Sequence, residues 1–195
     1  MKSNINHYYR KNDSKRILQG DILKDFKIHT YDDKVKMITI PYGVVLSQDC
    51  DLNQDYNSQK EYERLNLEKN DKNNPNLNSK LLPSILICPA YDAEQLRKGE
   101  HLQHIDIPMN EISKTRKTPW KNILQNQTPR YHYLKESEEF GIPDLVLDFK
   151  RYYSVSRDYL YSIYTKHYFI SINELYREDL SDRFFNYQSR IGLPK

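Results

Sequence analysis

The sequence predicts an α+β fold: a small, strongly bent β-barrel with helical additions and a C-terminal amphipathic helix. Many short segments have the apolar content or the alternation of β-strands, and few have the length and period of a helix. The clearest helical period comes at the end of the chain. The 195 residues suit one domain spanning 1–195, and the 17 tyrosines indicate a thin core with a tyrosine rim.

The first part of the chain predicts an arm followed by strands. Residues 1–16 are basic and polar, which is typical of a loose N-terminal arm. β-branched and apolar residues then predict three strands. They span 22–28, 35–40 and 44–46, with a turn at Gly20-Asp21 before the first and a break at Pro41 before the last. The last is a continuous apolar run, so we expect it to be covered on both faces.

The middle of the chain alternates between polar loops and short regular elements. The expected elements are an acidic turn at 48–52, a helical turn or two at 61–67, an Asn/Lys-rich surface loop at 68–80, an apolar strand at 81–89, a short helix at 93–98 ended by Gly99, and a weak strand at 130–135. Residues 105–126 have poor periodicity. A half-buried strand follows, with Leu145, Leu147 and Phe149 on one face and Asp148 and Lys150 on the other.

The C-terminal segment predicts an amphipathic helix over about 172–191. Ser171 and Glu174 have the spacing of a capping box, and Gly192 and Pro194 supply a stop. An apolar stripe recurs at helical steps, at Tyr176, Leu180, Phe184, Tyr187 and Ile191. Such a stripe usually packs on the rest of its own fold.

Charge and composition exclude several classes of protein. The net charge of +3 comes from interspersed signs, so global charge does not indicate a nucleic-acid partner. The sequence contains no run of about 18 apolar residues, so it predicts no membrane span. The first 15 residues lack the apolar stretch of a signal peptide, so we expect a cytoplasmic protein. Cys50 and Cys88 both lie in apolar segments, which predicts buried, reduced thiols. We expect no cofactor and no metal, because His101 and His104 have no cysteine pair nearby and suit surface positions.

The segment Gln48 to Leu52 offers two carboxylates where a strand meets a loop. Asp49 and Asp51 could hold a cation, or act as acid and base if burial separated their pKa values. Alternatively, these short acidic side chains form turns or cap the following backbone. The residues by themselves favour the structural role.

The order of three segments resembles the PemK/MazF toxin family. Gly20-Asp21-Ile22, then the run from Gly43 to Ser47, then Leu86 to Pro89 follow the motifs of that barrel. The motif positions taken together are Gly20, Asp21, Val44, Val45, Leu46, Ser47, Gln48, Asp49, Cys50 and Asp51. The acidic turn, with Arg183-Phe184 and the segment 190–194, is similar to a longer, divergent branch of the family associated with prokaryotic defence loci.

The resemblance implies an activity that this sequence fits poorly. Active members cut single-stranded RNA and carry arginine just before the Val-Val-Leu-Ser strand, where this chain has Tyr42. A neutral side chain cannot stabilise a developing phosphoryl charge as arginine does. An endoribonuclease of the family's type therefore remains only as an alternative function. Its relocated catalytic groups would come from Asp49, Asp51, His29 and His132, with Lys24 or Arg130 as the cation.

The preferred function is a non-catalytic binding module that sequesters a protein partner. The resemblance implies an anti-sigma-like regulator of antiviral or stress signalling, with a sigma-factor-like protein as partner and a protease that releases it; an antitoxin is the partner in the alternative. Tyrosine-rich strands and the last helix supply candidate contacts. They are Tyr152, Tyr153, Tyr176, Phe184, Tyr187 and Arg190.

One basic loop also has the composition of a platform for single-stranded RNA. Such platforms combine cations with aromatic rings on which bases stack. The candidate residues are Lys114, Arg116, Lys117, Trp120 and Lys121. A solvated loop anchored by one tryptophan has the same composition and is favoured, because one aromatic ring gives little stacking.

Overall fold

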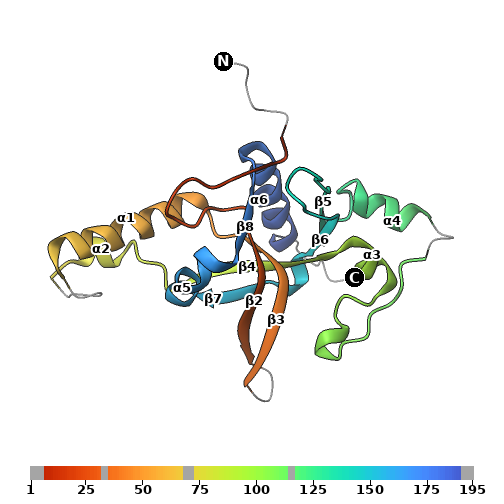
Figure 1. The fold of residues 1–195 in the computed structure, drawn as a ribbon, viewed down its shortest axis with the longest axis horizontal. Helices are drawn as coiled ribbons and strands as arrows, with labels where there is room; N and C mark the ends of the chain where they lie inside the picture. The colour runs from red at the N-terminus through yellow and green to blue at the C-terminus, as the bar shows by residue number, and fades with distance from the viewer. Residues whose placement is uncertain (1–6, 32–34, 68–72, 114–116, 190–195) are drawn as a thin grey trace.

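A computed structural model of the chain describes residues 7–31, 35–67, 73–113 and 117–189. Its centre is one curled antiparallel sheet that forms a half-barrel, with helices around it (Figure 1). The predicted α+β class is confirmed at this level. Among the described residues, no helix combines the length and the apolar composition that a membrane span requires.

All strand pairs of the sheet are antiparallel. The strands are β1 (Tyr9–Arg10), β2 (Asp21–Tyr31), β3 (Val35–Val45), β4 (Ser84–Asp92), β5 (Tyr131–Leu134), β6 (Leu145–Asp148), β7 (Tyr153–Ser156) and β8 (Tyr168–Ile172). Their order in the sheet is β1-β8-β2-β3-β4-β6-β5, and β7 pairs with β4. The strands that carry the toxin-like motifs, β2, β3 and β4, are therefore neighbours at its centre.

Helices extend from both sides of this sheet. They are α1 (Asp49–Leu65), α2 (Pro75–Asn78), α3 (Ala93–Lys98), α4 (Lys117–Leu124), α5 (Arg157–His167) and α6 (Glu174–Gln188), with short 3-10 turns at Gln103–Ile105 and Phe149–Arg151. Figure 1 shows α1 and α2 extending to one side of the sheet and α4 to the opposite side, with α6 between them.

The central strands are covered on both faces, as the apolar run predicted. Val44 belongs to a cluster that α6 covers through Leu180, whereas the next residue, Val45, belongs to a cluster that α5 covers through Leu160. Successive residues of a strand point to opposite faces, so one short apolar run supplies both clusters. A third cluster forms under α3 and α4 and includes Val146.

The N-terminal arm is not loose where the structure describes it; residues 1–6 of the predicted arm lie outside the described residues. Tyr9 is buried and pairs with β8, and Asn12 bonds to the buried Asp21. The predicted break at Pro41 is also wrong, because β3 runs through it. Pro41 and Asp25 lie opposite each other and are left out of the pairing of β2 with β3, and Asp25 has a φ of 52°. This local irregularity accommodates Pro41, which has no N–H to donate.

The predicted acidic turn is the beginning of a helix. Gln48 is the N-cap of α1, and Asp49 and Asp51 lie in its first turn, where carboxylates suit the helix dipole. Cys50 is therefore exposed on a helix, and only Cys88 is buried in a strand as expected; both thiols are free. In the predicted loop 68–80, the described part contains α2, and residues 68–72 lie outside the described residues.

Of the other elements predicted in the middle of the chain, some are confirmed and one differs in its burial. The helix over 93–98 is confirmed with Gly99 as its left-handed C-cap, and the weak strand at 130–135 is confirmed as β5. The strand predicted around Leu145 to Phe149 exists as β6, but its half-burial is wrong, because Val146 and Asp148 are fully buried. The third cluster covers the face expected to meet water, and Arg130 pairs with Asp148. Helix α4 lies within the region of poor periodicity.

The C-terminal helix exists, but with a different beginning. Asn173 is the N-cap and accepts a hydrogen bond from the Glu174 backbone N–H, whereas Ser171 lies in β8 and donates to Asp21. The predicted end, at 190–194, lies outside the described residues. The tyrosine-rich stretch is only partly a strand, because Tyr159, Tyr161 and Tyr164 lie on α5.

We expect Gly43→Ala to lower the free energy of unfolding by about 1–3 kcal/mol. A Cβ atom at Gly43 would lie 2.7 Å from the Phe26 ring and 2.8 Å from the Ile87 side chain, so these two buried side chains would have to shift. Thr39→Ala, at an exposed position of the same strand, is the matched control and should change little. Chemical denaturation measures both, and equal stabilities for the two variants would contradict the packing argument.

Candidate functional site

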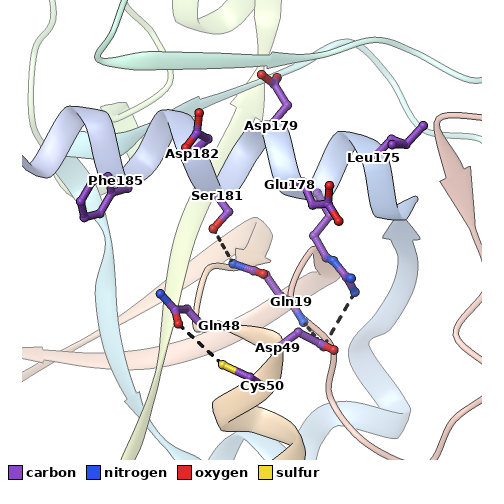
Figure 2. A pocket seen from close by; sticks show the side chains of 11 residues that line it. Gln19, Gln48, Asp49, Cys50, Leu175, Glu178, Asp179, Ser181, Asp182 and Phe185 are labelled. Carbon is purple, nitrogen blue, oxygen red and sulfur yellow. Dashed lines mark hydrogen bonds and ion pairs between the residues drawn. The ribbon is translucent and has the colours of Figure 1, made fainter.

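The main candidate site is a groove between the beginning of α1 and one face of α6. It has a volume of about 820 Å³ (Figure 2). Gln19 and the first residues of α1 form one wall, and α6 forms the other from Leu175 to Phe185. The segment from Gly43 to Asp51 therefore leads directly into the groove.

Asp49 lies on the wall of this groove in a network of charged and polar donors. Arg16 donates to its two carboxylate oxygens at 3.0 and 2.9 Å, the Gln19 backbone N–H donates at 3.3 Å, and Arg177 lies at 3.8 Å. Burial by itself would raise the pKa of Asp49, but the hydrogen bonds and charge of Arg16 and the charge of Arg177 hold that pKa below its usual range. A carboxylate held in this way ties the N-terminal arm to α1 and is a poor proton acceptor.

The other motif residues also have structural roles. Gly20 has a φ of 82°, and Arg177 lies where a side chain would extend. The Gln19 side chain donates to the Leu46 carbonyl and to Ser181 of α6, both at 3.1 Å. The Ser47 hydroxyl accepts from the Leu86 backbone N–H at 2.8 Å. The motif thus joins β3, β4 and α6.

A smaller cavity continues the groove toward the end of α6. Its volume is about 300 Å³, and it shares Gln48, Ser181 and Phe185 with the larger one. Its remaining walls are mostly apolar and come from Leu46, Leu82, Leu86 and Phe184, with Asp51 and Gln188 at the edge. The groove therefore has a polar end and an apolar end.

The α6 wall combines exposed carboxylates with exposed apolar side chains. Glu178, Asp179 and Asp182 are exposed, and no ion pair joins them to any described residue. Leu175 is 58% exposed and Phe185 is 66% exposed. Figure 2 shows Asp179 and Asp182 on the outer side of α6, whereas Ser181 points inward to Gln19. Sequence reasoning missed this face because Leu175 and Phe185 lie off the predicted apolar stripe.

The structure does not gather the candidate catalytic residues into one site. Asp49 and Asp51 lie on α1, and the described partners of Asp49 are arginines and a backbone N–H. His29 is exposed in the β2-β3 hairpin, opposite Met37. His132 lies in β5, and two strands separate β5 from β3. These groups have no contact through which one could activate another.

His132 is buried against α6 and has a structural partner. Arg183 donates to its Nδ1 at 3.1 Å and also to the backbone carbonyls of Asn126, Thr128 and Tyr131. Burial, and then the charge of Arg183, lower the pKa of His132 to about 3. The ring is therefore neutral at physiological pH, and Arg183 joins α6 to β5.

The surface position expected for His101 is wrong. Its ring is 4% exposed and packs edge-on against Tyr91, with ring centroids 4.9 Å apart. Burial lowers its pKa to about 4. His104 is exposed as expected. Among the described residues, no group of three His, Cys, Asp or Glu side chains could hold a metal ion.

The candidate RNA-binding residues that the structure describes lie on a helix rather than in a loop. Lys114 and Arg116 lie outside the described residues, and Lys117 and Lys121 belong to α4. Trp120 packs against the cluster under α3 and α4, which supports the anchoring role of this ring. Of the other candidate cations, Arg130 is bound by Asp148 at 2.7 and 2.5 Å.

Most of the candidate partner contacts also pack within the chain. Tyr153 lies against the cluster under α5, and Tyr176 stacks on Tyr8 with centroids 4.0 Å apart. Phe184 and Tyr187 both contact the Phe149 ring. Tyr152 is 41% exposed, and Arg190 lies outside the described residues.

Comparison with known proteins found no matching family model, no similar curated protein and no similar solved structure.

We expect the protein to lose stability as the pH falls from about 6.5 toward 4. Because His132 and His101 have pKa values of about 3 and about 4 when folded and about 6.5 when unfolded, the unfolded chain binds more protons in this range. Each histidine contributes a slope of up to about 1.4 kcal/mol per pH unit. The free energy of unfolding is measured by urea denaturation between pH 7.5 and 4.5. His132→Leu should remove about half of the pH dependence that the two histidines contribute. His104→Leu is the control, and an unchanged slope in His132→Leu would contradict the assignment.

We expect Asp49→Ala to loosen the N-terminal arm and to lower the free energy of unfolding by about 1–3 kcal/mol, because Arg16 loses its charged hydrogen-bond acceptor. Hydrogen exchange should accelerate over residues 12–20. Asp13→Ala, at an exposed position of the same arm, is the control and should leave exchange unchanged. Normal exchange in Asp49→Ala would show that the ion pair does not hold the arm.

Proposed function

We propose that this chain is a non-catalytic binding module that sequesters a protein partner, which docks in the groove between α1 and α6. The observation that carries the proposal is the exposure of Leu175 and Phe185 along the wall of that groove. Large exposed apolar side chains beside a cavity are typical of interaction sites. Partner residues can enter both the larger and the smaller cavity.

The polar groups of the toxin-like motif support binding over catalysis. Asp49 is held by Arg16, and the Ser47 hydroxyl accepts a backbone hydrogen bond. A general base needs an accessible acceptor whose pKa lies near the working pH, and the pKa of Asp49 is shifted the opposite way. The side chains that remain available in the groove suit recognition.

The family resemblance supplies a finer version of this proposal. In that version the module is an anti-sigma-like regulator of antiviral or stress signalling in the cytoplasm, which holds a sigma-factor-like protein until a protease releases it. An antitoxin is the corresponding partner of the alternative function. The identity of the partner and the role of a protease stay predictions.

One observation favours the alternative, an endoribonuclease of the PemK/MazF type. Lys24 pairs across β2 and β3 with Tyr42, the residue that replaces the family's arginine, and its Nζ atom lies 5.5 Å from the ring centroids of Tyr42 and Phe169. A cation on the neighbouring strand could supply part of the charge that Tyr42 lacks. If this alternative were correct, the purified protein would cut a long unstructured RNA, and Lys24→Ala would slow the cleavage.

We expect the chain to form a stable complex with one of the proteins encoded beside it in its native genome. Each candidate is co-expressed with the full chain, and the complex is measured by size-exclusion chromatography with light scattering. Phe185→Asp should abolish the complex, because it places a charge at the apolar end of the groove. Met37→Asp, at a 59% exposed apolar position of the β2-β3 hairpin, is the matched control. Absence of any complex, together with cleavage of RNA by the wild-type chain, would replace the proposal by the alternative.

A further inference from the structure

We infer that the groove binds a basic segment of the partner that also carries one large apolar side chain. The apolar side chain enters the smaller cavity beside Phe185, one lysine or arginine side chain pairs with Glu178, and a further cation of the segment lies near Asp182 on the outer side of α6. This inference rests on the proposed function, because it states which chemistry the groove selects.

The smaller cavity suits an apolar anchor. Its apolar lining comes from three leucines and two phenylalanines: Leu46, Leu82, Leu86, Phe184 and Phe185. The other lining residues are polar or charged: Ser47, Gln48, Asp51, Ser181 and Gln188. A volume of about 300 Å³ is at the low end for binding pockets and suits one large side chain better than a whole ligand. Phe185 is 66% exposed, so an apolar group placed there would remove much of its ring from water.

The charges of the groove favour cations. Five carboxylates line the two cavities, from Asp49, Asp51, Glu178, Asp179 and Asp182. Among the described residues, the arginines that form ion pairs with these carboxylates are Arg16, which is paired with Asp49, and Arg177, which lies 3.8 Å from the same carboxylate. Asp179 also interacts electrostatically with Arg183. Glu178 and Asp182, together with the exposed Asp51 of α1, are therefore the carboxylates most available to a partner.

This pattern of charge also disfavours two other occupants. Nucleic acid and anionic membrane surfaces both present negative charge, which an acidic groove repels. The chain as a whole carries a net charge of +3, so the groove is locally opposite in sign to the molecule. A second copy of the chain is thus an electrostatically possible occupant, and the test below separates it from a partner segment.

The spacing of the exposed apolar residues sets the length of the segment. Leu175 and Phe185 are ten positions apart on α6, which is about 15 Å along a helix axis. About five extended residues or ten helical residues cover that distance. A peptide of twelve residues is therefore long enough to span the groove in either conformation.

Fluorescence anisotropy with the full chain tests the inference. The probe is a labelled twelve-residue peptide with four lysines or arginines and one phenylalanine, compared with a peptide in which serine replaces the phenylalanine and one in which glutamate replaces the cations. We expect the first peptide to bind, and each replacement to weaken binding by about tenfold or more. Raising the salt concentration should weaken binding further.

Protein variants locate the binding site. Glu178→Lys combined with Asp182→Lys should weaken the basic peptide about tenfold, and Phe185→Ala should do the same for the peptide that carries phenylalanine. Glu63→Lys, at an exposed position of α1, is the matched control and should bind as the wild type does. Circular dichroism of every variant confirms that each one is folded.

Other outcomes would overturn the inference. Equal binding of the basic and acidic peptides, or unchanged binding in the α6 variants, contradicts it, and so does a self-association that depends on Phe185. If an identified partner binds in a Phe185-dependent manner while no basic peptide binds, the inference fails and the proposed function stands. If basic peptides bind in the groove while no protein forms a complex with the chain, the proposed function fails instead.

Discussion

The structure depends on one buried carboxylate, that of Asp21 at the beginning of β2. It accepts hydrogen bonds from the Leu18 backbone N–H at 2.7 Å, from Tyr164 at 2.6 Å, from Ser171 at 2.5 Å and from Asn12 at 3.2 Å. Burial still raises the pKa of Asp21 in spite of these donors. An ionised group without such donors would be too costly to bury, so the arm, α5 and β8 must all be in place together. Because β8 leads directly into α6, this cluster also fixes the wall of the groove.

The sequence allowed the sheet to be predicted but concealed the helix beside the groove. The buried residues of α1 are Leu52, Asp55, Ser58 and Tyr62, which recur at helical spacing. Two of the four are polar, so hydrophobic periodicity cannot detect them. Asp55 is buried because Arg157 of α5 donates to it at 2.8 Å, a contact between residues 102 positions apart. Long-range ion pairs of this kind have no local signature.

The sequence predicts only part of the groove, because the contacts that form it also join residues far apart in the chain. The motif from Gly20 to Asp51 includes Gln48, Asp49 and Cys50, which line the groove, but the pairing of Asp49 with Arg16 and its closeness to Arg177 depend on how the arm and α6 meet. The exposed apolar residues Leu175 and Phe185 of α6 lie off the apolar stripe that the sequence predicts. Once Leu180 and its neighbours are packed on the sheet, the exposed remainder of the helix becomes informative.

The same contacts explain how a toxin-like motif could serve recognition. Several polar groups of this segment are hydrogen-bonded within the chain: the Gln19 side chain donates to the Leu46 carbonyl, and Ser47 accepts from the Leu86 backbone N–H of β4. Groups that are fully engaged in this way hold a surface rigid but offer little to a reacting substrate. A rigid wall lowers the entropic cost of binding, because its side chains need not be ordered when a partner arrives. The motif thus supplies the support, and the exposed face of α6 supplies the selectivity of the proposed site.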